Sequence, residues 1–329
     1  MNKNIKAITI GDINGIGIKL LINIWKFKRK IIGPFILITN YNLFNKYIKK
    51  NKIKIPYLKI HNFSKIKIIS DSYIPIFHIE ADTDIMNTYN SIIYGYYLTK
   101  KKHCESLITL PINKEKIIKN VDKNFMGQTE LLQKLDNKKY SNMIFYSKNI
   151  IITTLTTHIP LNKINYYLKN TQIIEKKIYS IYKTLKIDFN ILKPKIVICG
   201  LNPHAGENGN IGKEEKKFLN PVIMKLNKKG VNIEGPFSAD TIFNTSNRKK
   251  YDCFICIYHD QALIPFKIFT KNTGINYTGS LDIIRTSPAH GTAYNLINTN
   301  KASTKCLINS FLFANKILKN RKKNINALS

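Results

Sequence analysis

Two hydrophobic patterns alternate along this chain. Short apolar runs rich in Ile, Val, Phe and Thr lack helical spacing, which predicts strands buried on both faces, whereas longer stretches with apolar residues every three or four positions predict amphipathic helices. Strands are expected at 6–10, 34–39 and 106–110, and in the runs that begin at Asn149, Lys195 and Cys253. This alternation predicts an α/β fold in which a largely parallel sheet carries helices on both faces.

The predicted helices lie between these strands. The first is expected to begin at about Ile18, and the others are expected at 91–101, 163–185, 213–228 and 302–322. The two halves of the chain differ in character, which predicts two domains with the functional site in the cleft between them. We expect a discontinuous first domain, residues 1–125 plus 268–329, and a second domain, residues 126–267.

Three of the seven histidines stand just after three of the strand-like runs: His158, His204 and His259. In open α/β sheets, ligands bind beyond the carboxyl ends of the strands. Three imidazoles that meet at such an edge are typical ligands of a divalent metal that keeps open positions for a substrate. A single histidine at the end of an element is more often a satisfied polar residue, so the spacing alone leaves both interpretations open.

The composition is that of a globular protein. The chain has 329 residues, 43% of them hydrophobic, and Lys or Asn interrupts every long apolar run, so no membrane span is expected. The start of the chain enters a strand directly and has no signal-peptide organisation. Five cysteines at unrelated positions form no disulfide framework. These features predict a cytoplasmic protein with no membrane partner.

The formal net charge of +33 is the feature that most suggests nucleic acid, because basic surfaces collect phosphate backbones. Only four of the 53 basic residues are arginines, however, although base readers and phosphate forks rely on Arg. Lysines are scattered along the chain together with abundant Ile, Asn and Tyr, which share A/T-rich codons. We therefore favour a compositional origin of the charge and expect no specific nucleic-acid partner.

In a chain whose composition favours Lys, Ile, Asn and Tyr, an Arg or Gly residue is more often required at its position, so the Arg and Gly residues are informative. Arg285 lies in a segment without a lysine patch, and Gly127 precedes Gln128 and Thr129 at the expected start of a helix, where substrates can be bound. The segment from Gly11 to Gly17 places three glycines between the first strand and the first helix. That turn suits either an anion or tight strand–helix packing. It does not match the dinucleotide fingerprint, so the sequence assigns no cofactor contacts.

Two segments are highly specific motifs, Asn202-Pro-His-Ala-Gly-Glu207 and Tyr258-His-Asp-Gln261. Further motifs are Ile8 to Gly17, Gly127-Gln-Thr-Glu130, Thr156 to Leu161, Gly235 to Phe243, and His290-Gly-Thr-Ala293. Together, in their order along the chain, these segments resemble the 4-hydroxythreonine-4-phosphate dehydrogenase (PdxA) family of pyridoxine biosynthesis. The similarity runs nearly from end to end. It implies an isocitrate/isopropylmalate dehydrogenase-like fold and a homodimer with the active site at the interface, formed by the second domain.

The resemblance also implies an activity and the residues that serve it. The family oxidises 4-phosphooxy-L-threonine at C3 with NAD and then decarboxylates the product to 3-amino-2-oxopropyl phosphate. The matching metal ligands are His158, His204 and His259, for Zn²⁺, Mg²⁺, Co²⁺ or Mn²⁺. The matching substrate-binding positions are Gln128, Thr129, Lys267, Asn276 and Arg285. Asp240 and Asp260 are expected either to orient a ligand or relay a proton, or to have only turn and capping roles.

The chain departs from the family where Gln128 replaces a histidine, the turn after the first strand lacks the usual prolines, and Ala289 stands where an acidic residue is common. An amide can donate to a substrate oxygen but cannot transfer a proton. A related dehydrogenase, acting on another phosphorylated four-carbon hydroxy acid such as a phospho-threonate, is therefore the first alternative. A metal-dependent hydrolase or lyase and a nucleic-acid-binding protein are the others.

Overall fold

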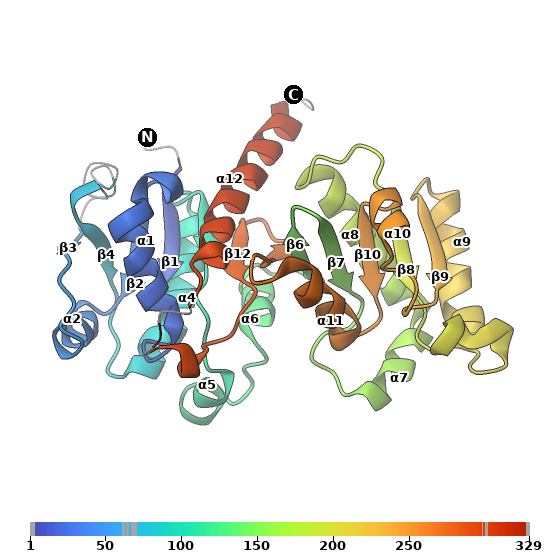
Figure 1. The fold of residues 1–329 in the computed structure, drawn as a ribbon, viewed down its shortest axis with the longest axis horizontal. Coiled ribbons are helices and arrows are strands. Elements are labelled where there is room, and N and C mark those ends of the chain that lie inside the picture. Colours follow the sequence, from blue (N-terminus) through green and yellow to red (C-terminus); the bar gives the residue numbers. More distant parts are fainter. Residues whose placement is uncertain are drawn as a thin grey trace. The chain divides into compact units, whose positions relative to one another are not determined.

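The computed structural model describes residues 4–60, 63, 66, 71–297, 299 and 302–326. Strands and helices alternate along the chain (Figure 1), which confirms the predicted α/β class. The chain forms two compact units. Unit 1 consists of residues 1–139 and 281–319, and unit 2 of residues 140–280 and 320–329.

Unit 1 is built on a sheet in which neighbouring strands are parallel. In spatial order the strands are β3 (Tyr57–Lys59), β4 (Ile74–His78), β2 (Phe35–Thr39), β1 (Lys6–Thr9), β5 (Ser106–Ile108) and β12 (Arg285–Pro288). The central strand β1 pairs with β2 on one side and β5 on the other, and all four of its residues are buried. The strands expected at 6–10, 34–39 and 106–110 are thus confirmed.

Helices cover both faces of this sheet because successive side chains of a buried strand point to opposite faces. Phe35 of β2 belongs to the core beneath α1, α2 and α12, whereas Ile36 belongs to the core beneath α4 and α6. The helices of unit 1 are α1 (Ile16–Ile32), α2 (Tyr41–Lys50), α4 (Asp84–Lys100), α5 (Lys114–Asn120), α6 (Gln128–Leu135) and the start of α12 (Lys305–Asn326). None of the helices in the described ranges is long and apolar enough to span a bilayer.

Unit 2 has a mixed sheet, less parallel than the sequence suggested. Its spatial order is β11 (Ile275–Gly279), β6 (Asn142–Ser147), β7 (Ile150–Thr154), β10 (Cys253–Cys256), β8 (Ile196–Cys199) and β9 (Ile233–Phe237). The pairs β11–β6 and β6–β7 are antiparallel, and the other three pairs are parallel. Consequently β7, β10 and β8, the three strands that precede the histidines, are adjacent and run in one direction.

Two helices expected in unit 2 are each divided. The segment expected at 163–185 forms α7 (Ile164–Lys169) and α8 (Thr171–Ile187), because Asn170 caps α8 by accepting from the backbone N–H of Ile173. The segment expected at 213–228 forms one wide turn (Glu215–Leu219) followed by α9 (Asn220–Lys228). The remaining helices are α10 (Thr245–Lys250) and α11 (His259–Thr270).

The division into units differs from the expected domain boundaries at three places. One is the end of the chain from residue 320, which lies in unit 2, where Arg321 contacts Asp188. Residues 126–139 lie in unit 1, since Leu132 of α6 packs into the core formed with α4. Residues 268–280 lie in unit 2, since β11 forms its ladder with β6. Gln128 therefore belongs to unit 1 and Asn276 to unit 2, the reverse of the expected assignment.

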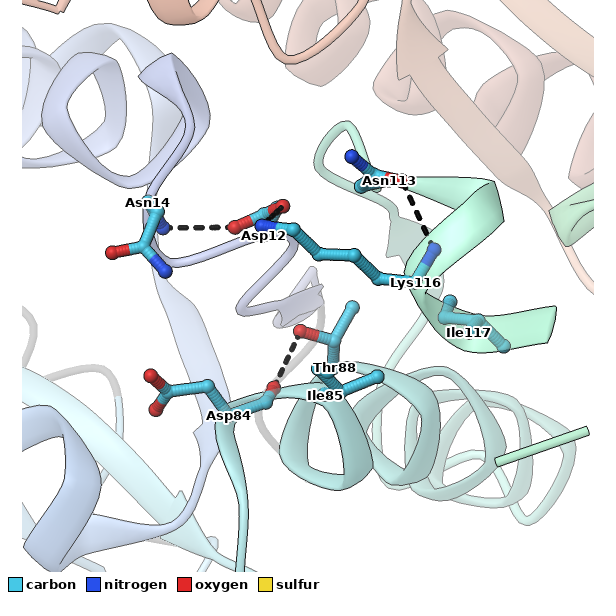
Figure 2. Close-up of a pocket in the computed structure, with 8 residues that line it drawn as sticks. All are labelled: Asp12, Asn14, Asp84, Ile85, Thr88, Asn113, Lys116 and Ile117. Carbon is cyan, nitrogen blue, oxygen red and sulfur yellow. Dashed lines mark hydrogen bonds and ion pairs between the residues drawn. The ribbon is translucent and has the colours of Figure 1, made fainter. Parts of the chain in front are cut away.

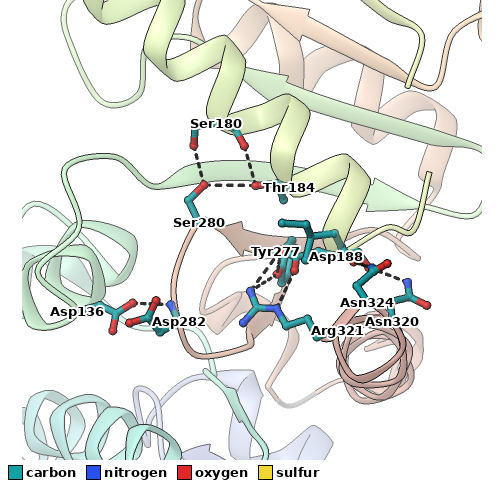
Figure 3. A network of polar contacts seen from close by, with 11 residues as sticks. Asp136, Ser180, Thr184, Asp188, Tyr277, Ser280, Asp282, Asn320, Arg321 and Asn324 are labelled. Carbon is teal, nitrogen blue, oxygen red and sulfur yellow. Dashed lines mark hydrogen bonds and ion pairs between the residues drawn. The ribbon is translucent and has the colours of Figure 1, made fainter. Parts of the chain in front are cut away.

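A buried polar network fastens β11 and the end of α12 within unit 2 (Figure 3). The hydroxyl of Tyr277 donates to Asp188, and Arg321 Nε lies 2.7 Å from Asp188 Oδ1. Nearer the start of the unit, the amide of Asn142 donates to the hydroxyls of Ser180 and Ser280, each at 2.8 Å. These contacts hold the middle and the C-terminal end of β11, the strand that carries Asn276.

Candidate functional site

The three predicted histidines follow the carboxyl ends of adjacent parallel strands. His158 comes four residues after β7, His204 lies in the turn after β8, and His259 is the first residue of α11, directly after β10. The strand order is β7–β10–β8, so all three residues lie at one edge of the unit 2 sheet. The predicted placement of the three histidines after strand ends is therefore confirmed.

His158 and His259 face one another at this edge. Their ring centroids are 5.7 Å apart with an interplanar angle of 41°. The edge of the Phe145 ring packs against His259, with a centroid distance of 6.5 Å. Imidazoles that share one tetrahedral ion have centroids roughly 5 Å apart, given metal–nitrogen bonds of about 2 Å. The spacing of this pair suits two ligands of one ion.

Asp260 orients the ring of His259. Its Oδ1 lies 2.7 Å from Nδ1 of His259. Because an ionised carboxylate only accepts hydrogen bonds, this contact places the ring proton on Nδ1 and directs Nε2 away from Asp260. Carboxylates commonly support metal-binding histidines in this way, so the geometry agrees with the orienting role expected for Asp260.

His204 lies apart from that pair within the chain. In the part of the chain that the structure describes, no group of three or more His, Cys, Asp or Glu side chains is spaced to hold a metal ion. His204 instead borders a hollow of about 770 Å³ that also includes Glu207, Lys216 and Ser238. Within one chain, the imidazoles of His158 and His259 therefore fit two ligands of a divalent metal, whereas the imidazole of His204 lines the hollow described above.

Asp240 belongs to the surroundings of His204. The hydroxyl of Ser238 donates to its Oδ1, and this bond lowers the pKa of the Asp240 carboxyl, with a smaller contribution from the charge of His204. The lowered pKa means that the ionised form of Asp240 is stabilised, so this side chain is suited to hold a negative charge beside a ligand rather than to donate a proton.

Gln261 links the two strand ends that carry His204 and His259. Its Oε1 accepts from the backbone N–H of Ile257 at 2.7 Å, and its Nε2 donates to the carbonyl of Gly200 at 2.8 Å. Its position two residues after His259 was the available signal, but only the fold brings Gly200 within reach.

In unit 1, Arg285 forms a buried cluster with two of the other predicted substrate-binding residues. It is 3% exposed, and its Nη2 donates to Gln128 Oε1 at 3.2 Å while its Nη1 lies 3.4 Å from the hydroxyl of Thr129. Thr109, which sequence reasoning missed, accepts from Nε at 3.0 Å and from Nη2 at 2.6 Å. Burial lowers the pKa of Arg285 to about 10, so the guanidinium stays charged at neutral pH.

Asn276 and Lys267 lie in unit 2. In the antiparallel ladder Asn276 is opposite Phe145, so both side chains point to the face on which Phe145 meets His259. Oδ1 of Asn276 is buried and has no hydrogen-bond partner among the described residues. A buried amide oxygen of this kind is costly unless a ligand or water satisfies it. Lys267 is exposed on α11.

The glycine-rich turn after β1 is held by polar contacts around Asp12 (Figure 2). Asp12 accepts from the backbone N–H of Asn14 at 2.9 Å, and its Oδ2 lies 3.3 Å from Lys116 Nζ. Gly11 has φ +67°, and a Cβ there would lie 2.7 Å from Cβ of Leu110. The adjacent hollow of about 20 Å³ has room for little more than one water molecule. Close packing thus explains this turn.

The fold is of the isocitrate and decarboxylating dehydrogenase type. A β-decarboxylating dehydrogenase from Thermococcus kodakarensis shares it with a TM-score of 0.52 and 12% identity, over 98% of this chain and 86% of that one. The family described as "Pyridoxal phosphate biosynthetic protein PdxA" matches residues 33–314. The chain belongs to the PdxA family.

Relatives and solved structures agree with that assignment. The chain is 35% identical to 4-hydroxythreonine-4-phosphate dehydrogenase of Aquifex aeolicus, over 92% of this chain and 94% of the relative. It is 34% identical to the protein of the same name from Wigglesworthia glossinidia brevipalpis, over 93% and 95%. A crystal structure of the Klebsiella pneumoniae enzyme of that name has a TM-score of 0.81 and 27% identity, over 97% of this chain and 98% of that one.

Proposed function

We propose that this chain is a metal-dependent dehydrogenase of pyridoxal phosphate biosynthesis. Its reaction is the NAD-dependent oxidation of 4-phosphooxy-L-threonine at C3, followed by decarboxylation to 3-amino-2-oxopropyl phosphate. The observation that carries the proposal is the His158–His259 pair, oriented by Asp260, in a member of the PdxA family. A divalent ion held by this pair, and by His204 of the partner subunit in the homodimer proposed below, would supply Lewis acidity for the oxidation and for the loss of CO₂.

In this proposal the substrate is recognised by two positively charged side chains, Arg285 and Lys267, and by the buried amide oxygen of Asn276. Arg285 offers a planar fork for a phosphate or carboxylate, and Thr109 together with Gln128 fixes the orientation of that fork. Asn276 presents a buried amide oxygen that lacks a partner among the described residues, which suits a substrate hydroxyl or ammonium donor. Lys267 adds an exposed positive charge on the helix that begins with His259.

The two aspartates, Asp260 and Asp240, have different roles in the proposed reaction. Asp260 holds the Nδ1 proton of His259 and so keeps the ring in one tautomer. Asp240, whose carboxylate is stabilised by the hydrogen bond from Ser238, can orient a ligand by its negative charge near His204. The two carboxylates thus have separate tasks at two histidines.

The proposal includes a homodimer whose active site uses residues of both subunits, as the family resemblance implies. Mixing two inactive variants, His158→Ala and His204→Ala, tests this arrangement. If the two histidines of one site come from different subunits, mixed dimers contain one intact site and recover part of the activity. Activity that stays absent after subunit exchange would contradict a shared site.

The decisive test is turnover by the purified full-length protein loaded with Zn²⁺, Co²⁺, Mn²⁺ or Mg²⁺. We expect NADH formation from 4-phosphooxy-L-threonine with equimolar release of CO₂, abolished in His259→Ala and retained in His103→Ala, a variant of an exposed histidine stacked on Phe63. No turnover with any of these metals would overturn the proposal.

The contact between Gln128 and Arg285 favours one alternative substrate class. An uncharged amide beside the guanidinium leaves recognition of the phosphate or carboxylate to Arg285 alone. This suits a related phosphorylated four-carbon hydroxy acid such as a phospho-threonate. A higher kcat/KM for that compound than for 4-phosphooxy-L-threonine would establish the alternative.

A further inference from the structure

The turn that carries His204 has a backbone conformation that L-residues rarely adopt. Five consecutive residues, 204–208, have positive φ values between 44° and 81°. In the left-handed region Cβ approaches the following carbonyl oxygen, so non-glycine residues occupy it singly and not in runs. Only one of the five is a glycine, Gly206. A turn of this kind persists only where the surrounding groups hold it in place.

The group that holds this turn is the carboxylate of Glu215. Its Oε1 accepts from the backbone N–H groups of Leu201 and Asn202, each at 2.8 Å. Its Oε2 accepts from the side-chain amide of Asn202 at 3.0 Å. Glu215 is 4% exposed, so these bonds lie away from solvent, where hydrogen bonds to a charged acceptor are strong.

Glycines around the carboxylate show how closely the turn fits it. A Cβ on Gly206 would lie 2.7 Å from Glu215 Oε2, and one on Gly200 would lie 2.8 Å from the Cα of Ala205. A Cβ on Gly212 would lie 2.2 Å from the amide nitrogen of Asn202. Backbone and carboxylate therefore touch directly, and the position of one determines the position of the other.

We propose that Glu215 is a positioning residue for His204. By holding the backbone two and three residues before the histidine, its carboxylate fixes where the imidazole lies when it binds the metal. This inference rests on the metal-binding role proposed above for His204. The neighbouring Glu214 accepts from the side-chain amides of Asn202 and Asn165, whereas Glu215 accepts from the backbone that precedes the turn, so Glu214 serves as the control.

Metal affinity is the readout that separates positioning from a merely structural role. The full-length protein, freed of metal, is titrated with Co²⁺, and binding is followed by calorimetry and by the visible spectrum of the bound ion. Glu215→Gln retains the size of the side chain but places an NH₂ group against the N–H donors of Leu201 and Asn202. We expect it to weaken Co²⁺ binding about 10- to 100-fold, the range typical for groups that support metal ligands. Glu214→Gln should change the affinity much less.

A second pair of variants covers the case in which Glu215→Gln does not fold. Gly206→Ala pushes a methyl group against Glu215 Oε2, whereas Gly230→Ala adds one in open space at nearly the same φ, +79° against +81°. The backbone strain is matched, so only Gly206→Ala should weaken Co²⁺ binding. A lowered Tm with unchanged Co²⁺ affinity in Glu215→Gln or Gly206→Ala would overturn the positioning role.

His204→Ala distinguishes the two levels of the proposal. If His204→Ala loses Co²⁺ affinity while Glu215→Gln and Gly206→Ala bind like the wild type, the positioning role of Glu215 is wrong and the proposed metal site stands. If His204→Ala itself binds Co²⁺ like the wild type, the proposed metal site is wrong, and the positioning role is overturned with it.

Discussion

At the scale of single residues, rare side chains were the most informative part of the sequence. Arg285 could be singled out because only four arginines remain in a lysine-rich chain, and the structure places it in a buried cluster with Gln128 and Thr129. Thr109, which accepts two of its hydrogen bonds, could not be singled out. Threonine is common in strands, and only the pairing of β5 with β12 brings this one beside the guanidinium.

The amide of Gln128 makes a specific prediction at this scale. Its Oε1 accepts from Arg285 while its Nε2 donates to the carbonyl of Leu110 at 3.1 Å. A neutral imidazole in Gln128→His can make both bonds, but a protonated one cannot accept from the guanidinium and repels it. We expect kcat/KM of Gln128→His, relative to the wild type, to fall as the pH drops through about 6.5.

The matched control for that prediction is Gln133→His, later on the same helix, where the side-chain amide donates to the carbonyl of Lys139. Its activity relative to the wild type should not vary with pH in this range. A constant ratio for Gln128→His between about pH 6 and 8 would show that Arg285 does not sense the charge at this position.

At the scale of elements, the strands were predictable and the interruptions of helices were not. Runs of Ile, Val and Phe determine β2, β8 and β10 because a strand buried on both faces needs mostly apolar side chains. The break at Asn170 was not predictable, since asparagine is frequent throughout the chain and nothing in the sequence distinguishes the one that caps a helix. The left-handed turn at His204 depends on Glu215, which lies 11 residues further on.

The central strand β1 begins with a buried lysine, which gives a prediction about stability. Lys6 is 2% exposed, and burial lowers its pKa to about 8. Below pH 8 the folded state must keep this buried ammonium charged. From pH 8 to 10.5 the unfolded chain binds more protons, so this destabilisation is relieved as the pH rises.

We therefore expect Lys6→Met to increase the free energy of unfolding at pH 7 by about 3 kcal/mol, with the gain vanishing as the pH approaches 10.5. Urea unfolding at several pH values measures both effects. Lys26→Met, at an exposed lysine of α1, should have almost no effect at any pH. Equal stability of Lys6→Met and the wild type at pH 7 would mean that the ammonium is solvated in the folded protein.

Helix α12 ends in the buried Asp188–Tyr277–Arg321 cluster, and this gives a second prediction for an element. Burial raises the pKa of Tyr277 well above its usual value, so its hydroxyl remains a donor to Asp188. Arg321→Met removes the charged partner of a carboxylate whose side chain is 4% exposed. Loss of one partner of a buried pair costs about 3–5 kcal/mol, and we expect a decrease of that size in chemical unfolding.

An exposed ion pair provides the contrast for that measurement. Glu115 and Lys119 are each about 70% exposed, and Lys119→Met should change stability by less than about 1 kcal/mol. The double variant Asp188→Leu with Arg321→Met should regain part of the stability lost in Arg321→Met, because no unpaired charge is then buried. No regain would argue that Arg321 acts through packing alone.

At the scale of the whole molecule, class and family could be predicted from the sequence, whereas the division into units could not be placed exactly. The boundaries depend on long-range packing: Leu132 joins the core beneath α4, and β11 pairs with a strand more than 120 residues earlier. Neither contact leaves a local signal such as a proline-rich linker. The motifs were predictable because each combines rare residue types in a fixed order.

The formal charge of +33 leads to a prediction about the molecule as a whole. We expect weak, sequence-independent binding to double-stranded DNA at low salt, since scattered lysines neutralise phosphates without reading bases. Raising the salt from about 50 to 200 mM should abolish it, as a fluorescence anisotropy titration would show. Tight binding that persists above this range would indicate a dedicated nucleic-acid site.

The five cysteines are all buried thiols, two of them in unit 1 and three in unit 2. Burial raises the pKa of Cys104 to about 12 and that of Cys306 to about 11, so neither forms the reactive thiolate in the folded protein. The reaction of each thiol with a reagent therefore reports how often the structure around that cysteine unfolds. Under native conditions a thiol reagent should modify each cysteine only when the surrounding structure opens, so peptide mapping of the labelled sites would time the opening of the two units separately in a single sample.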